Sequence, residues 1–242
     1  MALLKDLREF FEQARQVKAL APTAYQPSNL RRFFRKWREF LVPGRNALDD
    51  EQPWVNFAAA NFLESILRPE MRVFEYGSGG STLFYGKRVQ QVVAIEHDPA
   101  WTSQVRERLK TRGFSHCDVR LIPPEEPKDA ASSDAADFNS YASSVKEYAG
   151  LSFEKYARSI EEFPDEFFSV VVVDGRARPS CSCHALAKVA TGGFFLLDNA
   201  EREHYRRVEA RLSNDQWKLN DFYGPGPYNR YFWRTCIWKK LE

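Results

Sequence analysis

Residues 72–82 read Arg-Val-Phe-Glu-Tyr-Gly-Ser-Gly-Gly-Ser-Thr, a short apolar run followed by a glycine-rich turn. A second apolar run, residues 91–96, ends in Glu96, nineteen positions after Gly77. Glycines let the backbone turn sharply and approach a ligand where a Cβ atom would collide. A strand, a glycine turn, a helix and a second strand with an acidic end are typical of a nucleoside-binding βαβ unit. In such a unit, the carboxylate of Glu96 can accept hydrogen bonds from both ribose hydroxyls.

The composition indicates a globular protein with no strong preference for a charged partner. A chain of 242 residues with 43% hydrophobic content can form one large domain with a full core. The formal net charge of +2 gives no overall attraction to nucleic acid or to a membrane surface. No apolar run approaches the roughly 18 residues of a membrane span. The early charges in residues 1–8 do not fit a secretory signal, and the four scattered cysteines do not fit a disulfide framework. We therefore expect a cytoplasmic protein.

Helical patterns precede the glycine turn. Residues 3–18 have apolar positions at a helical period, and residues 28–41 have an aromatic face opposite an arginine-rich face. Because these faces are opposite, we expect the aromatic face to join a core and the basic face to meet solvent. A third helix is expected over residues 52–67, with Pro53 in its first turn. Residues 1–50 are predicted to form an N-terminal helical extension.

From residue 71 onward, strand and helix patterns alternate. Five strands with helical crossovers predict a parallel sheet, because each helix returns the chain to the same end of the sheet. Two further strands are joined by Gly-Pro-Gly-Pro-Tyr-Asn, residues 224–229, which predicts an antiparallel hairpin. The seven expected strands are residues 72–76, 91–96, 118–122, 168–174, 193–198, 217–223 and 230–238.

This order of elements resembles the class I S-adenosylmethionine (SAM)-dependent methyltransferases over roughly residues 70–240. The resemblance implies an α/β, Rossmann-like sheet of seven mostly parallel strands with an antiparallel C-terminal hairpin, preceded by the N-terminal helices. It also implies a methyltransferase domain over residues 51–242, with a lid-like insertion at about residues 123–166. Within that insertion, residues 130–136 are small and polar and are expected to be mobile.

The turn itself favours SAM over a dinucleotide. A dinucleotide-binding turn would need glycine at position 82, where this chain has Thr82. SAM has no phosphate and does not require that glycine. NAD or FAD binding, or a turn that only connects a strand to a helix, are the alternatives.

The resemblance assigns cofactor contacts to both strand ends. Glu75 would hold the methionine ammonium, and the donors of the turn would receive the methionine carboxylate. Glu96 would hold the ribose, and His97 would lie near the adenine. Trp54 and Asn56 are expected to close over the cofactor. The full expected set is Trp54, Asn56, Glu75, Gly77, Ser78, Gly79, Gly80, Ser81, Glu96, His97 and Asp174.

Acidic and amide side chains end the fourth and fifth expected strands. Ligands bind beyond such strand ends, so Asp174 is the candidate catalytic residue beside the sulfonium. Asp174, Asp198 and Asn199 are similar to positions at which the catechol and caffeoyl-CoA O-methyltransferases hold a divalent cation. The similarity implies Mg²⁺ or Ca²⁺ at these three residues, lowering the pKa of an acceptor hydroxyl. The alternative is that Asp198 caps the next helix and Asn199 is a turn residue.

One position departs from that similarity. Those enzymes place a lysine, as general base, three residues after the first aspartate, where this chain has Ala177 between Arg176 and Arg178. An arginine keeps its proton in proteins and cannot act as the base. The two arginines could instead bind an acidic or phosphorylated group of the acceptor.

The expected function is methyl transfer from SAM to a small-molecule acceptor, at an oxygen atom, with or without a metal. The hairpin aromatics Tyr223, Tyr228 and Tyr231 are candidates for the acceptor wall. An RNA-modifying methyltransferase, suggested by the basic face of residues 28–41, and a SAM-binding protein without catalysis remain alternatives. A membrane partner is not expected and nucleic acid is the weaker candidate. The N-terminal helices could cover either the domain or a second copy in a homo-oligomer.

Overall fold

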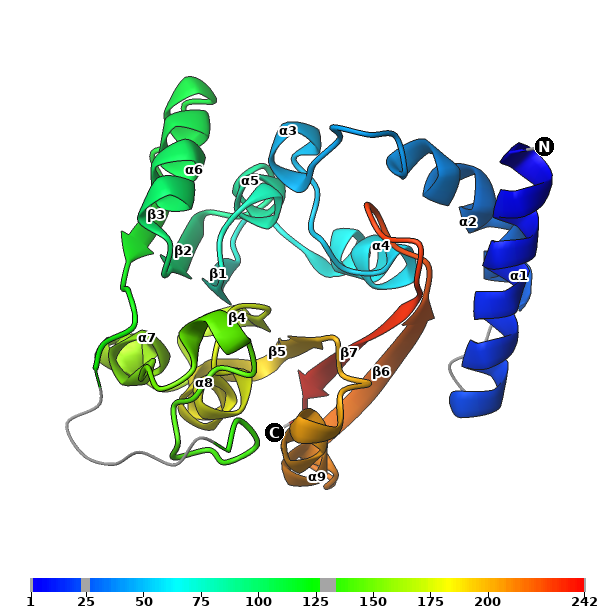
Figure 1. Cartoon of the computed structure of the whole chain (residues 1–242). Coiled ribbons are helices and arrows are strands. Elements are labelled where there is room, and N and C mark those ends of the chain that lie inside the picture. The colour runs from blue at the N-terminus through cyan, green and yellow to red at the C-terminus, as the bar shows by residue number, and fades with distance from the viewer. Residues whose placement is uncertain (1, 23–26, 127–133, 242) are drawn as a thin grey trace.

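The computed structural model describes residues 2–22, 27–126 and 134–241. Its centre is a seven-stranded sheet in the order β3-β2-β1-β4-β5-β7-β6 (Figure 1). The first five strands are parallel, and β7 is antiparallel to both β5 and β6. The predicted α/β sheet with an antiparallel C-terminal hairpin is therefore confirmed. The strands are β1 (Arg72–Tyr76), β2 (Gln91–Glu96), β3 (Cys117–Leu121), β4 (Phe168–Val173), β5 (Val189–Asp198), β6 (Trp217–Gly224) and β7 (Trp233–Lys240).

The start of β5 differs from the prediction. The strand begins at Val189, four residues before the expected start, and its pairing with β4 shifts between Phe168 and Val170. Gly192 has a φ of +79°, which favours glycine, and it lies within this irregular stretch. Gly192 therefore lies at a bulge inside the strand, which extends further toward its N-terminus than predicted.

Helices cover both faces of the sheet (Figure 1). The strand β4 shows why its sequence is almost entirely apolar: Val171 and Val173 join the core on one face, and Val170 and Val172 join the core on the other. One face is covered by α4 (Phe57–Ile66), α5 (Gly80–Gly86) and α6 (Pro99–Thr111), and the other by α7 (Glu154–Arg158), α8 (Arg178–Ala185) and α9 (Arg206–Leu212). Short 3-10 turns are η1 (Lys146–Tyr148), η2 (Ser159–Glu162), η3 (Leu186–Lys188) and η4 (Glu203–Tyr205).

The helices α1 (Ala2–Leu20) and α2 (Pro27–Phe40) pack beside α4 and the C-terminal hairpin. Trp37 is fully buried, and its indole nitrogen donates a hydrogen bond to the carbonyl oxygen of Asn229 at 2.9 Å. Arg32 and Arg35 are exposed on the other side of α2. The predicted separation of an aromatic core face from a basic solvent face is confirmed. The domain boundary at residue 50 stays a prediction.

The third helix begins later than predicted. A short helix, α3 (Ala47–Asp50), comes first, and α4 begins only at Phe57. The side chain of Asn56 accepts a hydrogen bond from the backbone nitrogen of Ala59, so Asn56 is the N-cap. Pro53 therefore precedes the helix and is not in its first turn.

The segment between α3 and α4 runs against the glycine turn. A Cβ atom added to Gly80 would lie only 1.9 Å from the carbonyl oxygen of Ala47. A side chain at position 80 would displace this backbone, so the glycine is required for packing between α3 and α5.

Part of the insertion at residues 123–166 belongs to the core. Phe153, Tyr156 and Ile160 are fully buried against β1 and β4, and Glu125 pairs with Ser152 in an isolated antiparallel bridge. The expected mobility of residues 130–136 falls largely on residues outside the described part of the chain, and lid closure stays a prediction. Among the described residues, no helix is long and apolar enough to cross a membrane.

Candidate functional site

A cavity of about 500 Å³ lies at the carboxyl ends of β1, β2 and β4. Its lining contains all of the expected cofactor residues except Asn56, Gly79 and Gly80. The parallel strands bring these residues together because their carboxyl ends meet at one edge of the sheet. The lining residues are Trp54, Glu75, Tyr76, Gly77, Ser78, Ser81, Glu96, His97, Asp98, Trp101, Glu147, Tyr148, Asp174, Gly175 and Arg176.

Thr82 supports the turn in a way that the sequence analysis missed. Its hydroxyl oxygen accepts a hydrogen bond from the backbone nitrogen of Gly79 at 3.0 Å, and the hydroxyl donates to a carboxylate oxygen of Glu75. Thr82, which stands where a dinucleotide-binding turn would need glycine, therefore joins the turn to Glu75 at the end of β1. A hydroxyl residue three positions after a helix N-cap is a known capping pattern, and that signal could have identified it.

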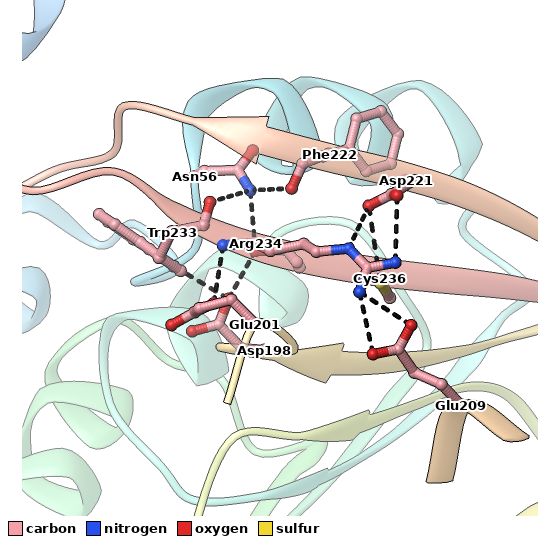
Figure 2. Close-up of polar contacts among 10 residues, drawn as sticks. Asn56, Asp198, Glu201, Glu209, Asp221, Phe222, Trp233, Arg234 and Cys236 are labelled. Carbon is pink, nitrogen blue, oxygen red and sulfur yellow. Dashed lines mark hydrogen bonds and ion pairs between the residues drawn. The ribbon is translucent and has the colours of Figure 1, made fainter. Parts of the chain in front are cut away.

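Asn56, Gly79 and Gly80 lie outside the cavity. Asn56 is fully buried, and its amide nitrogen donates to the carbonyl oxygen of Phe222 at 2.9 Å and to the hydroxyl of Thr235 at 3.0 Å (Figure 2). It therefore ties α4 to the hairpin and does not close over the cavity. A Cβ atom on Gly79 would face the ring of Trp101, and Gly80 faces the segment after α3.

Glu75 is a buried acid without a basic partner. It is 1% exposed, and no basic side chain of the described residues forms an ion pair with it. Burial raises the pKa of Glu75 to about 8, although hydrogen bonds from Thr82 and Ser81 favour the carboxylate. At neutral pH, Glu75 is therefore mainly the neutral acid. An incoming ammonium group would stabilise the carboxylate form.

Glu96, at the end of the neighbouring strand β2, is held in its ionised form. One carboxylate oxygen accepts from the backbone nitrogens of His97 and Asp98 at 2.7 and 3.0 Å. The other accepts from the backbone nitrogen and the hydroxyl of Ser78, both at 3.1 Å. Burial favours the neutral acid, but the bonds from His97 and Asp98 outweigh it and hold the pKa of Glu96 below its ordinary value.

The contacts of His97 indicate which of its ring nitrogens accepts a hydrogen bond. Its Nε2 atom lies 3.3 Å from Nε of Arg176 and 3.0 Å from the hydroxyl of Tyr148. Because the arginine nitrogen can only donate, Nε2 must accept. The ring proton therefore sits on Nδ1, which lies 2.6 Å from a carboxylate oxygen of Glu96. Tyr148 belongs to η1, so the insertion contributes to the wall of this site.

A second cavity of about 260 Å³ adjoins the first on the side of β5 and β7. Asp174 and Arg176 line both cavities, so Asp174 stands where they meet. Burial raises the pKa of Asp174, and the nearby arginines Arg178, Arg202 and Arg176 oppose that rise. Of the three hairpin tyrosines, Tyr231 lines this cavity, whereas Tyr223 and Tyr228 pack with the N-terminal helices. The residues that line this cavity are Trp54, Asp174, Arg176, Arg178, Asp198, Asn199, Asn229, Tyr231 and Trp233.

The guanidinium of Arg178 occupies the centre of the expected metal site. It is 6% exposed, and its Nη2 atom lies 2.9 Å from a carboxylate oxygen of Asp174. Its Nη1 atom donates to the backbone carbonyl of Asp198 and to the side-chain oxygen of Asn199. A permanent cation among these three residues would repel a second one.

Asp198 is also engaged elsewhere. One of its carboxylate oxygens accepts hydrogen bonds from the indole of Trp233 at 3.0 Å and from the hydroxyl of Thr235 at 2.5 Å (Figure 2). The residues present therefore do not fit the predicted Mg²⁺ or Ca²⁺ site. Among the described residues, no group of three His, Cys, Asp or Glu side chains could hold a metal ion. The alternative interpretation of these two residues holds in part. Asn199 is a turn residue, as expected, with a φ of +52°. Asp198, however, binds side chains of β7 and does not cap a helix.

The hairpin is fixed in place beside Asp198 by Arg234. Its guanidinium lies between the carboxylates of Asp221 and Glu209 (Figure 2), and the shortest nitrogen–oxygen distance to each is 2.8 Å. Its backbone nitrogen donates to Glu201 at 2.9 Å. These contacts join β6, β7, α9 and the turn after β5, and so they hold the outer wall of the second cavity.

Comparison with known proteins supports the fold. No family model and no curated protein matches the sequence. A protein from Klebsiella pneumoniae, assigned as an O-methyltransferase, superposes with a TM-score of 0.57 at 16% identity over 98% of this chain and 100% of its own. The O-methyltransferase from Bacillus cereus, in complex with S-adenosylhomocysteine (SAH), gives 0.55 at 14% identity over 94% and 96%.

This chain has the fold of the class I methyltransferases. That fold is shared with proteins assigned to different acceptors. A protein from Clostridium thermocellum, assigned as an rRNA methylase, superposes with a TM-score of 0.52 at 9% identity over 83% of this chain and 99% of its own. The methyltransferase fold therefore leaves the acceptor to be argued from the site.

Replacement of Arg178 by alanine is expected to destabilise the protein by about 2–3 kcal/mol, because the backbone carbonyls of Asp174, Gly175 and Asp198 would lose a donor and the partly exposed Asp174 would lose its ion pair. Urea denaturation at neutral pH measures this. Arg206→Ala is the control, because Arg206 forms an exposed ion pair with Glu203 and should cost no more than about 1 kcal/mol. Equal losses of unfolding free energy in the two variants would contradict the conclusion that Arg178 stabilises the ends of β4 and β5.

Proposed function

We propose that this protein is a SAM-dependent methyltransferase that methylates an oxygen atom of a small molecule without a metal ion. The observation that carries the proposal is the meeting of two cavities at Asp174. The first offers a buried acid for an ammonium group and an ionised carboxylate for a ribose. The second is open to an acceptor and has aromatic walls. The fold shared with the Bacillus cereus O-methyltransferase, which was solved with SAH, supports the same assignment.

In this proposal, the methionine ammonium of SAM pairs with Glu75, the ribose hydroxyls bind Glu96, and the adenine lies near His97 and Trp101. Glu75 gives up its proton when the ammonium arrives. Glu96 is already ionised, and the ribose hydroxyls replace its two contacts with Ser78. The methyl-bearing sulfur then lies toward Asp174, at the entrance of the second cavity.

Methyl transfer is an in-line displacement at this junction. The sulfur–methyl bond breaks as the oxygen–methyl bond forms, leaving SAH and a methyl ether. The hydroxyl proton of the acceptor passes to the carboxylate of Asp174, and burial raises the pKa of Asp174, which strengthens it as a proton acceptor. Arg178 keeps Asp174 in place through their 2.9 Å ion pair. Positioning of the two reactants supplies the main part of the rate acceleration.

Cofactor binding tests the proposal directly. Calorimetry should show micromolar-range binding of SAM and SAH and no comparable binding of NAD. Glu96→Gln should weaken SAH at least about tenfold, because a charged acceptor of two ribose hydrogen bonds is lost. Glu107→Gln, an exposed glutamate on α6, is the matched control and should bind SAH normally. Absence of SAM and SAH binding would contradict the assignment.

Turnover separates the remaining alternatives. Release of SAH from SAM with a hydroxylated small molecule would distinguish an enzyme from a protein that only binds SAM. Salt-sensitive binding of RNA, with methylation of that RNA, would instead favour an RNA-modifying enzyme. The burial of the α2 aromatic face argues for the small molecule, because those rings cannot stack on bases.

The affinity for SAH should rise with pH. Below a pKa of about 8, Glu75 holds a proton that must leave before it can pair with an ammonium group. The association constant should therefore increase by up to about tenfold between about pH 6 and about pH 7, with release of one proton. Calorimetry in buffers of different ionisation enthalpy measures both the association constant and the number of protons released. A flat profile would show that Glu75 does not pair with the ammonium.

The raised pKa of Glu75 also makes the stability of the folded protein depend on pH. Stability should fall as pH rises, whereas the affinity for SAH should increase. The folded pKa of about 8 exceeds the ordinary value of 4.5, so the empty protein gains stability from the protonated acid below pH 4.5 and loses it as pH rises toward 8. Glu75→Gln removes this loss. The variant should therefore bind SAH weakly, with a flat pH profile, while melting at a higher temperature than the parent at about pH 8.

A further inference from the structure

The two arginines at the cavity junction differ in how their donors are used. All five donor positions of Arg178 have acceptors, namely the backbone carbonyls of Asp174, Gly175 and Asp198 and the side chains of Asp174 and Asn199. Arg176 uses only Nε, toward His97. Within the described part of the chain, its two terminal nitrogens have no hydrogen-bond acceptor, and the guanidinium forms no ion pair.

The position of Arg176 is fixed although its terminal nitrogens are unused. Its guanidinium carbon lies 5.3 Å from the ring centre of Tyr148, within the range of a cation–π contact, and Nε lies 3.3 Å from His97. The residue lines both cavities. A half-buried guanidinium that is held in place, with free donors toward a cavity, is suited to bidentate recognition of a carboxylate.

The charges around the second cavity leave this guanidinium uncompensated. The nearest carboxylate in sequence, Asp174, is paired with Arg178. Asp198 is also held by other groups, Trp233 and Thr235. Burial, together with Asp174, raises the pKa of Asp198 well above its ordinary value, which favours its neutral form. Two aspartates and two arginines line the cavity, and of the two arginines Arg176 is the one with terminal nitrogens left to bind an anionic ligand.

The remaining walls are aromatic. Trp54 and Tyr231 are about half exposed, at 47% and 51%, and Trp233 is buried beside them. A volume of about 260 Å³ accommodates one ring with small substituents. Given the function proposed above, we propose that the methyl acceptor is a hydroxylated aromatic carboxylic acid, whose carboxylate is bound by Arg176. Arg176 is then the residue that determines acceptor specificity.

The test uses 3,4-dihydroxybenzoate and its neutral amide, 3,4-dihydroxybenzamide, as probes titrated into the protein saturated with SAH. The acid should bind at least about tenfold more tightly than the amide, as expected for hydrogen bonds to a charged group. Arg176→Gln should remove this preference when both titrations are made at SAH saturation, whatever its effect on the affinity for SAH. Arg206→Gln, at an exposed position on α9, should keep the preference.

Several results would overturn the inference. These are equal binding of acid and amide, no binding of the acid below about 10 mM, and a preference that survives Arg176→Gln. If Arg176→Gln weakens SAH and not the acid, the arginine serves the cofactor. Each of these results is obtained on a protein that binds SAH, so each leaves the proposed function standing. Failure of SAH itself to bind removes the proposed function and this inference together.

Discussion

The buried guanidinium of Arg178 is the interaction on which the arrangement of this site depends. It joins the ends of β4 and β5, the two strands whose carboxyl ends lie where the first and second cavities meet. The tight loop before it makes this possible. Ala177 has a φ of +44°, and a Cβ atom on Gly175 would lie 2.0 Å from the hydroxyl of Tyr156. The backbone therefore turns back sharply and places the arginine directly on the strand ends.

The two glutamates of the cofactor cavity illustrate how local contacts set the charge of similar groups. Glu75 and Glu96 end adjacent parallel strands and are both buried. Glu96 faces several backbone and side-chain donors, whereas Glu75 faces two hydroxyl-bearing residues and no cation. Glu96 is therefore ionised and can bind neutral hydroxyls that replace the Ser78 donors, and Glu75 is neutral until a cation arrives. This pairing matches the two ends of SAM, a ribose and an ammonium group.

The sequence predicted the parts of this structure that depend on local patterns. Strands β1 and β2 have the predicted bounds because an apolar run, a glycine turn and a terminal acid are all contiguous. The roles of Asn56 and Asp198 could not be predicted. Their partners Phe222 and Thr235 are distant in the sequence and become neighbours only when β7 inserts between β5 and β6.

The poor fit of the expected metal site has the same origin. Its three residues do converge, but Arg178 converges with them, and no local pattern indicated that its side chain folds back onto the strand ends. Thr82 is a different case, because its capping position was visible in the sequence and only its bond to Glu75 required the fold.

The central claim is that one SAM molecule lies between Glu75 and Glu96 with its sulfur at Asp174. A crystal structure of the SAH complex tests this most directly. The account predicts the SAH ammonium against the Glu75 carboxylate, both ribose hydroxyls on Glu96, and the sulfur facing Asp174 at the mouth of the second cavity. SAH bound with its ammonium away from Glu75, or with its sulfur directed away from Asp174, would contradict it.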